Sequence, residues 1–148
     1  QKKLKLGNLN AKRDWGHAKD YVETMWLILQ HKNPDDWVIA TGLNFSVRDF
    51  TSKAFEKLGI KLEFKGKGVN EVGIIKEINK NSKLKKGETI VEVDSAYFRP
   101  TEVENLLGDS SKARELLNWR PKYNFDSLVD DMIINDLEIA KKEFKINS

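Results

Sequence analysis

The spacing of apolar residues divides the first third of the chain into a strand, a helix and a second strand. Alternating residues predict a short strand over 3–6, which ends at Gly7. A stripe of apolar side chains at helical spacing then predicts a helix that begins after Gly16. The continuous apolar run over 37–41 has the length of a strand, and its composition is typical of a strand covered on both faces.

The middle of the chain has the pattern of a helix followed by strands. Ser46 and Asp49 have the spacing of a capping box, which predicts the start of a helix that runs to Leu58. Gly59 is placed to close this helix in a left-handed conformation. Alternating apolar and polar residues predict three strands after it: 60–65, 73–78 and 89–93.

The last third is predicted to be helical. A short helix capped by Asp109 or Ser110 should reach Leu117, and Pro121 separates it from a long amphipathic helix. The apolar stripe of the long helix contains Leu128, Val129, Met132, Ile133, Leu137 and Ala140. Alternation of helices and strands along the whole chain predicts an α/β or α+β fold.

The composition fits a folded domain and excludes several kinds of site. The chain has 148 residues, of which 39% are hydrophobic and 33% are charged, a balance typical of globular proteins. The longest apolar run, Met25–Leu29, is far too short to span a bilayer, so we expect no membrane partner. The sequence has no cysteine, which excludes disulfides and thiolate zinc sites and favours a cytoplasmic location.

The charge balance gives little support for a nucleic-acid partner. There are 26 basic and 23 acidic residues, for a net charge of +3 and a pI near 9.0. The basic residues are scattered, and no RNA-recognition, zinc-finger or helix-turn-helix pattern accompanies them. We therefore expect no nucleic-acid partner, and a small basic nucleic-acid-binding module is kept as an alternative.

The usual catalytic and cofactor signatures are missing. His17 and His31 are the only histidines, and without cysteine they do not make a metal site; His17 is interpreted as a loop or helix-start residue. Gly66, Gly68 and Gly73 have the wrong spacing for a dinucleotide-binding fingerprint. No tyrosine is followed four positions later by lysine. We therefore assign no catalytic, cofactor-binding or metal-binding residue in this chain.

Two segments present arginine side chains beside predicted turns. Arg13 lies between a predicted strand and a predicted helix, and its planar guanidinium suits a phosphate or a carboxylate. A surface ion pair with Asp14 or Asp20 is the alternative. Arg99 and Glu102 lie on a turn stiffened by proline, where arginine suits an anion and the carboxylate suits the hydroxyls of a ribose. The alternative there is a simple pair between Arg99 and Glu102.

These segments belong to a set of motifs that resembles the GDP-mannose 4,6-dehydratase family. The set includes LGNLNAKRDWGHAKDYV from Leu6, VIATG from Val38, SVRDF from Ser46 and YFRPTEVE from Tyr97. It continues in the same order with LLGDSSKA from Leu106, LNWRP from Leu117 and DLEIAKK from Asp136. RD[WF]xH alone indicates only the extended short-chain dehydrogenase/reductase superfamily, whereas RDWGHAKDY together with YFRPTEV is far more specific.

The resemblance implies a lyase that acts on GDP-mannose with NADP. The family oxidises C4 of the sugar, removes a proton at C5, loses water from C6 and returns the hydride to C6. The product is GDP-4-keto-6-deoxymannose, the precursor of GDP-fucose and related sugars. The family's catalytic and cofactor motifs lie in an N-terminal NADP-binding region and are missing here, so residues 1–148 are expected to be the C-terminal, substrate-binding portion, inactive alone.

The resemblance also implies roles for individual residues. Arg13 and Arg99 are expected to face the diphosphate of GDP-mannose and Glu102 its ribose. Residues 6–8 (Leu6, Gly7 and Asn8) are expected to border the base and the ribose. Trp15, Tyr21 and Trp26 are interpreted as packing residues, since they are aromatic residues at helical spacing.

The expected fold is the α/β substrate-binding lobe of an extended short-chain dehydrogenase/reductase. Segment 16–42 would return as a helix and a strand to the edge of an absent Rossmann sheet, and an apolar face would mark the place of that sheet. Segment 66–92 is expected to be a variable insertion that forms a hairpin. The full-length enzyme is expected to be a dimer or a tetramer. The substrate lobe of another NAD(P)-dependent sugar-nucleotide epimerase or dehydratase is the alternative.

Overall fold

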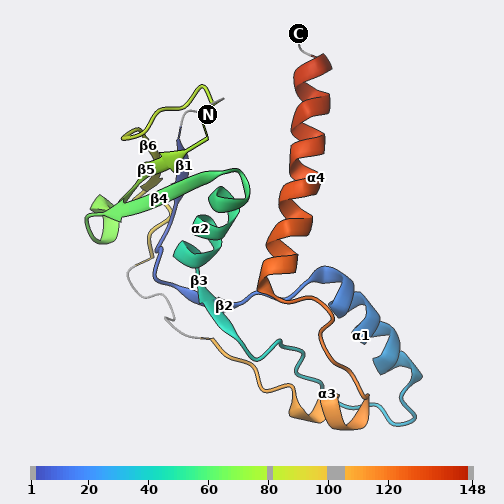
Figure 1. Ribbon diagram of the computed structural model, residues 1–148. Helices are drawn as coiled ribbons and strands as arrows, with labels where there is room; N and C mark the ends of the chain where they lie inside the picture. The colour runs from blue at the N-terminus through green and yellow to red at the C-terminus, as the bar shows by residue number, and fades with distance from the viewer. Residues whose placement is uncertain (1–2, 80–81, 100–105, 147–148) are drawn as a thin grey trace. The chain divides into compact units, whose positions relative to one another are not determined.

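The computed structural model describes residues 3–79, 82–99 and 106–146, and the chain forms two compact units (Figure 1). The first unit comprises residues 1–12 and 46–104, and the second comprises 13–45 and 105–148. The chain passes from one unit to the other within two short strands that pair with each other, β2 (Lys12–Asp14) and β3 (Asn44–Ser46). The apolar pattern had not indicated either strand, because three residues are too few to show alternation.

The first unit is built on a four-stranded sheet. Its strands, in spatial order, are β1 (Leu4–Leu6), β6 (Thr89–Val93), β5 (Val72–Ile78) and β4 (Ile60–Lys65). β1 runs parallel to β6, whereas the other two pairs are antiparallel. A short 3-10 turn, η1 (Gly68–Asn70), leads into β5. These strands agree with those predicted from the alternation of side chains.

Helix α2 (Val47–Lys57) lies against this sheet (Figure 1). Its start is the predicted capping box, because the Ser46 hydroxyl accepts from the Asp49 N–H while the Asp49 carboxylate accepts from the Ser46 N–H. Gly59 has φ +76°, so the left-handed end of the helix is also confirmed. Phe55 packs from α2 onto the core of the sheet.

The core of the first unit lies at the centre of the sheet. Its buried residues are Ile60, Ile75, Ile90 and Val91, and partly buried apolar residues surround them. β5 and β6 supply three of these four, so the part of the chain expected to be an insertion forms the middle of the sheet and not an appendage. Its variability stays a prediction.

The second unit is helical. It contains α1 (Ala18–Gln30), α3 (Ser111–Leu116) and the long α4 (Phe125–Ile146), and all three helices match the predicted positions. The buried apolar residues of this unit are Ala40, Ala113, Trp119, Leu128 and Val129. No helix in the described part of the chain is both long and apolar enough to cross a bilayer.

Helix α1 buries polar residues and exposes its apolar stripe. Its buried residues are Asp20 and Thr24. The apolar stripe, which follows the i, i+3, i+4, i+7 spacing of one helix face, is 60–78% exposed: Val22, Met25, Trp26 and Leu29. Trp26, interpreted as a packing residue, is 60% exposed in this structure and is not covered within the described part of the chain. An exposed apolar face was itself expected, and this stripe is such a face.

Segment 37–41 is not a strand in this structure, contrary to the prediction from its apolar run. Its backbone groups bond to side chains instead. The Ala40 carbonyl accepts from the Ser110 hydroxyl at 2.8 Å, and the Thr41 N–H donates to Asp14 at 3.0 Å. A segment becomes a β-strand only when its backbone forms hydrogen bonds with a neighbouring strand. Apolar side chains alone do not provide such a neighbouring strand.

Candidate functional site

The two motif segments of the first unit meet at one edge of its sheet. Because β1 and β6 are parallel, with Leu6 opposite Val93, the segments that follow them leave the sheet at the same edge. The Asp94 N–H donates to the Leu6 carbonyl at 2.8 Å. A Cβ on Gly7 would lie 2.5 Å from the carbonyl oxygen of Tyr97, so only glycine permits this approach. Residues predicted from separate motifs thus lie side by side.

The loop after β1, residues 7–11, is ordered by its own side chains. The Asn8 side-chain oxygen accepts from the Asn10 N–H at 2.9 Å, which is an Asx turn. Leu9 is almost fully buried and anchors the loop. The predicted site residue Asn8 therefore lies on an ordered loop at the sheet edge, and its carboxamide oxygen helps to shape that loop.

The segment after β6 is ordered by Asp94. The Asp94 carboxylate accepts from the Ala96 N–H and from the Lys5 ammonium, each at 3.0 Å. These hydrogen bonds, with that from Ala96 the larger cause, lower the pKa of Asp94 below its usual value. Arg99 follows on an exposed position. Glu102 lies outside the described residues.

Arg13, in contrast, belongs to the second unit, where it lies half-buried on β2. The next residue, Asp14, forms what we call a clamp, a carboxylate that accepts from two successive backbone N–H groups. Its two oxygens accept from the N–H groups of Thr41 and Gly42, at 3.0 and 2.9 Å. The Trp15 indole N–H donates to the Phe45 carbonyl at 2.9 Å. The predicted site residues are therefore divided between the units: Arg13 lies in the second, and Arg99 with residues 6–8 lies in the first.

The same motif contains a second clamp. The Asp20 carboxylate, which is 1% exposed, accepts from the N–H groups of Lys122 and Tyr123, each at 3.1 Å. This contact joins the first turn of α1 to the segment before α4. Asp14 and Asp20, the predicted alternative ion-pair partners of Arg13, thus each hold a pair of successive backbone N–H groups.

His17 completes the attachment of α1. It is the N-cap of the helix, where its Nδ1 accepts from the Lys19 N–H at 3.1 Å, so the interpretation as a helix-start residue is confirmed. Its Nε2 lies 3.0 Å from the Asp131 carboxylate, and its ring stacks on Tyr123 at 3.9 Å. Hydrogen bonds from Lys19 and His17, in that order, lower the pKa of Asp131.

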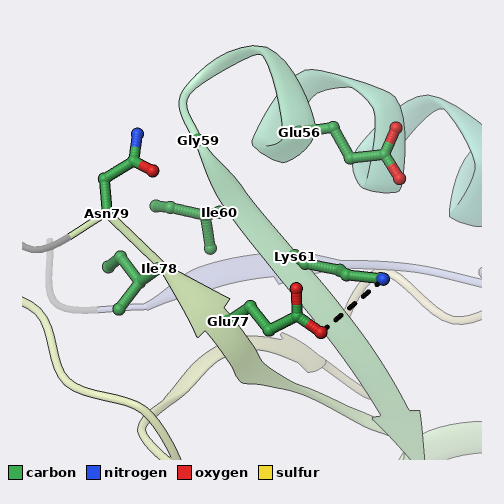
Figure 2. Close-up of a pocket in the computed structure, with 7 residues that line it drawn as sticks. All are labelled: Glu56, Gly59, Ile60, Lys61, Glu77, Ile78 and Asn79. Atoms are coloured by element: carbon green, nitrogen blue, oxygen red, sulfur yellow. Dashed lines mark ion pairs between the residues drawn. The ribbon is translucent and has the colours of Figure 1, made fainter.

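A hollow of about 400 Å³ in the first unit does not coincide with the predicted residues (Figure 2). It lies where β4 begins and β5 ends, which is the opposite edge of the sheet from residues 6–8. Its most prominent polar contact is the exposed ion pair between Lys61 and Glu77, at 3.6 Å. The hollow is therefore useful as a control region in the same unit.

A smaller hollow of about 300 Å³ lies in the second unit, beside the RDW motif. Four of its nine lining residues are aromatic, and the rings of Phe45 and Phe125 stack on each other at 4.1 Å. Because these two rings pack against each other, we interpret the hollow as a surface depression beside packed aromatic side chains.

The described residues do not fit a dinucleotide or a metal ion. The Gly-x-Gly segment, residues 66–68, leads into η1 and then β5, whereas a dinucleotide-binding turn opens an α-helix that receives the pyrophosphate. Within the described ranges, no group of three or more His, Asp or Glu side chains is arranged to hold a metal ion. No step of a reaction is therefore assigned to a cofactor on these residues.

Comparison with known proteins identifies the family. The sequence profile described as GDP-mannose 4,6 dehydratase matches residues 1–132. The chain belongs to this family. A GDP-mannose 4,6-dehydratase of Vibrio cholerae serotype O1 is 50% identical over 143 residues, which are 95% of this chain and 38% of that protein. The human GDP-mannose 4,6 dehydratase is 52% identical over 136 residues, covering 92% of this chain and 34% of that protein.

Solved structures confirm the expected fold class. RMD from Pseudomonas aeruginosa, in a complex with NADPH, is 12% identical and covers 86% of this chain and 33% of its own, with a TM-score of 0.60. UDP-glucose 4-epimerase from Bifidobacterium longum, in a complex with NAD+ and UDP, is 16% identical. The match covers 87% of this chain and 33% of the epimerase chain, with a TM-score of 0.57. The chain thus spans little more than a third of the length of the relatives it matches.

Sequence reasoning missed one pair of residues at the proposed edge. Arg48, from the SVRDF motif, contacts both the loop after β1 and the buried Glu71. The sequence did contain one indication that Arg48 has a special role. Arg48 lies in the first turn of a predicted helix, where the helix dipole disfavours a cation.

Proposed function

We propose that this chain is the substrate-binding portion of a GDP-mannose 4,6-dehydratase and that it binds the GDP part of GDP-mannose. The observation that carries the proposal is the meeting of residues 6–8 with the segment 94–99 at one edge of the first unit, in a chain that belongs to this family. A nucleotide needs a loop for its base and ribose and cations for its phosphates, and these segments supply both kinds of group.

The roles follow from the chemistry of the side chains. Arg13 and Arg99 would pair with the diphosphate, since a guanidinium can form two parallel hydrogen bonds with phosphate oxygens. Glu102 would accept from the ribose hydroxyls. Residues 6–8 would border the base and the ribose with backbone groups. Each of these side chains binds and orients the substrate and takes no part in proton or hydride transfer.

NADP and the reacting side chains would belong to a part of the protein outside this chain. NADP supplies the temporary acceptor for a hydride when it is bound. The exposed stripe of α1 would pack against that part, since an apolar face of this kind is unfavourable in water. The native protein would then be a cytoplasmic lyase that works as a dimer or tetramer, and the chain alone would be inactive.

The proposal is tested by titrating GDP, UDP and single-stranded RNA at two salt concentrations, with heat of binding as the signal. We expect a preference for GDP, and we expect Arg13→Ala and Arg99→Ala each to weaken GDP binding at least about tenfold, because each removes a charged hydrogen bond. Matched controls remove a cation elsewhere: Arg120→Ala in the second unit and Lys61→Ala in the first.

Two results would contradict the proposal. RNA binding with a steep salt dependence and without a preference for GDP would favour the basic nucleic-acid module. Equal binding of UDP and GDP would favour the substrate lobe of another sugar-nucleotide enzyme. Separately, turnover of GDP-mannose by the chain alone would refute its inactivity.

A further inference from the structure

Arg48 occupies a position that the local rules of helix formation disfavour. It is the second residue of α2, where the N–H groups of the first turn carry a partial positive charge that repels cations. The neighbouring Ser46 and Asp49 follow the capping rules closely, so the helix start is otherwise well formed. A local rule that is broken in an otherwise consistent element is a sign that the residue serves something outside the helix.

The partner of Arg48 is a buried carboxylate. Glu71, between η1 and β5, is 6% exposed, and both of its oxygens accept from the Arg48 guanidinium, with Nη2 at 3.1 Å from Oε2. The guanidinium also lies over the ring of Phe64, 4.9 Å from its centre. A buried carboxylate is costly unless it is paired and hydrogen-bonded, and the half-buried Arg48 supplies both kinds of interaction to Glu71.

The other side of Arg48 holds the loop after β1. Its Nη2 donates to the Asn10 side-chain oxygen at 2.7 Å, and its backbone N–H donates to the Leu9 carbonyl at 2.9 Å. The Asn10 N–H in turn donates to the Asn8 side chain. A continuous series of hydrogen bonds therefore runs from Glu71 through Arg48 and Asn10 to Asn8.

Glu71 also reaches the second segment of the edge. Its backbone carbonyl accepts from the N–H of Val93 at 3.1 Å, and Val93 immediately precedes the segment 94–99. The pair of Arg48 and Glu71 is thus tied to both segments that meet at the edge of the sheet.

We propose that Arg48, held by Glu71, is a positioning residue that orders the loop after β1, residues 7–11, for the base and ribose of the bound nucleotide. This inference rests on the proposed function, and in it Arg48 acts through Asn10 and Asn8 without touching the ligand. Order in a binding loop before the ligand arrives improves affinity, because less conformational entropy is lost on binding.

The test is a double-mutant cycle in the native protein that contains this chain. Arg48→Lys, Asn10→Ala and the double variant are compared by the Kd for GDP and by KM and kcat with GDP-mannose. We expect each single variant to bind GDP about tenfold more weakly, the double variant to be no weaker than the weaker single, and KM to rise while kcat is unchanged.

Lys61→Ala is the matched control, since it removes an exposed cation and its ion pair from the opposite edge of the same sheet (Figure 2). It should leave the Kd and KM unchanged. A GDP affinity equal to that of the wild type in Arg48→Lys and Asn10→Ala would overturn the inference, as would effects that add in the double variant. If Arg48→Lys does not fold, Asn10→Ala decides alone, because the exposed Asn10 tolerates substitution.

Failure of the proposed function gives a different pattern. In that case Arg99→Ala also binds GDP as the wild type does, or the wild type shows no preference for GDP, and both proposals fall together. Loss of binding in Arg99→Ala with normal binding in Asn10→Ala overturns only the positioning role of Arg48.

Discussion

The two units are stabilised by different kinds of interaction. The first unit buries the aliphatic residues of its own sheet, with Ile75 and Val91 at the centre, and presents polar side chains outside. In the second unit, α1 exposes its apolar stripe and is attached through Asp20, whose carboxylate holds two backbone N–H groups. Non-directional burial stabilises the first, whereas directional hydrogen bonds play a larger part in the second.

The difference teaches how the apolar pattern of a helix should be interpreted. The stripe of α1 is as regular as that of a core helix, yet the core of this unit contains the polar face. An amphipathic pattern predicts that a face will be covered without indicating by what. The comparison therefore separates a unit with a buried aliphatic core from a unit whose first helix exposes an apolar stripe.

The largest effect is expected from Ile75→Ala in the first unit. Loss of a fully buried aliphatic side chain leaves a cavity and lowers the free energy of unfolding by about 3 kcal/mol. Hydrogen exchange of the backbone amides of β4, β5 and β6 measures this loss in the free energy of unfolding. Ile74→Ala is the control, since Ile74 is less buried and should cost less than half as much. Equal losses in the two variants would contradict a core on one face of the sheet.

A somewhat smaller loss is expected from Asp20→Asn in the second unit. The variant keeps the size of the side chain but turns an amide N–H₂ toward one of two backbone donors, which costs about 2 kcal/mol. Intrinsic fluorescence follows this unit selectively, because all four tryptophans lie in it. Asp136→Asn, on an exposed position of α4, should change nothing. A loss of stability no greater than in that control would show that the clamp is unimportant.

A change in association and not in stability is expected from the double variant Met25→Ser and Leu29→Ser. Both side chains are exposed, so the free energy of unfolding of the chain should move by no more than about 0.5 kcal/mol. Self-association, measured by sedimentation velocity, should fall because an apolar patch has been removed. Val69→Ser, at an exposed position of the first unit, should leave association unchanged. Strong destabilisation by the double variant would mean that the stripe is already covered.

The smallest effect is a pH dependence in the segment after β6. The pKa of Asp94 is lowered in the folded chain, so its hydrogen bonds are fully present above pH 3.8, the ordinary pKa of an aspartate, and are lost as the pH falls through the lowered pKa. A carbon-detected NMR titration of Asp94 and of the Ala96 amide measures this. Asp94→Asn should abolish the response at Ala96, and a midpoint at or above 3.8 in the wild type would contradict it.

Much of the local structure was predictable from the sequence. Helix α2 was predicted with its capping box and its closing glycine, because caps and left-handed turns are properties of a few neighbouring residues. Strands β4, β5 and β6 followed from the alternation of side chains. The motifs around Arg13 and Arg99 indicated the family, whereas the meeting of residues 6–8 with segment 94–99 was found only in the structure.

Only the tertiary structure decided which face of α1 is buried, that 37–41 forms no ladder, and that Asp14, Asp20 and Arg48 hold loops in place. The residues that make these contacts are far apart in the chain; Asp20 and Tyr123, for example, are separated by 103 positions. Periodicity and caps act over one or two turns, so they determine which helices and strands form. The partners of buried charges and of exposed apolar faces depend on contacts at long range, and these exist only once the chain has folded.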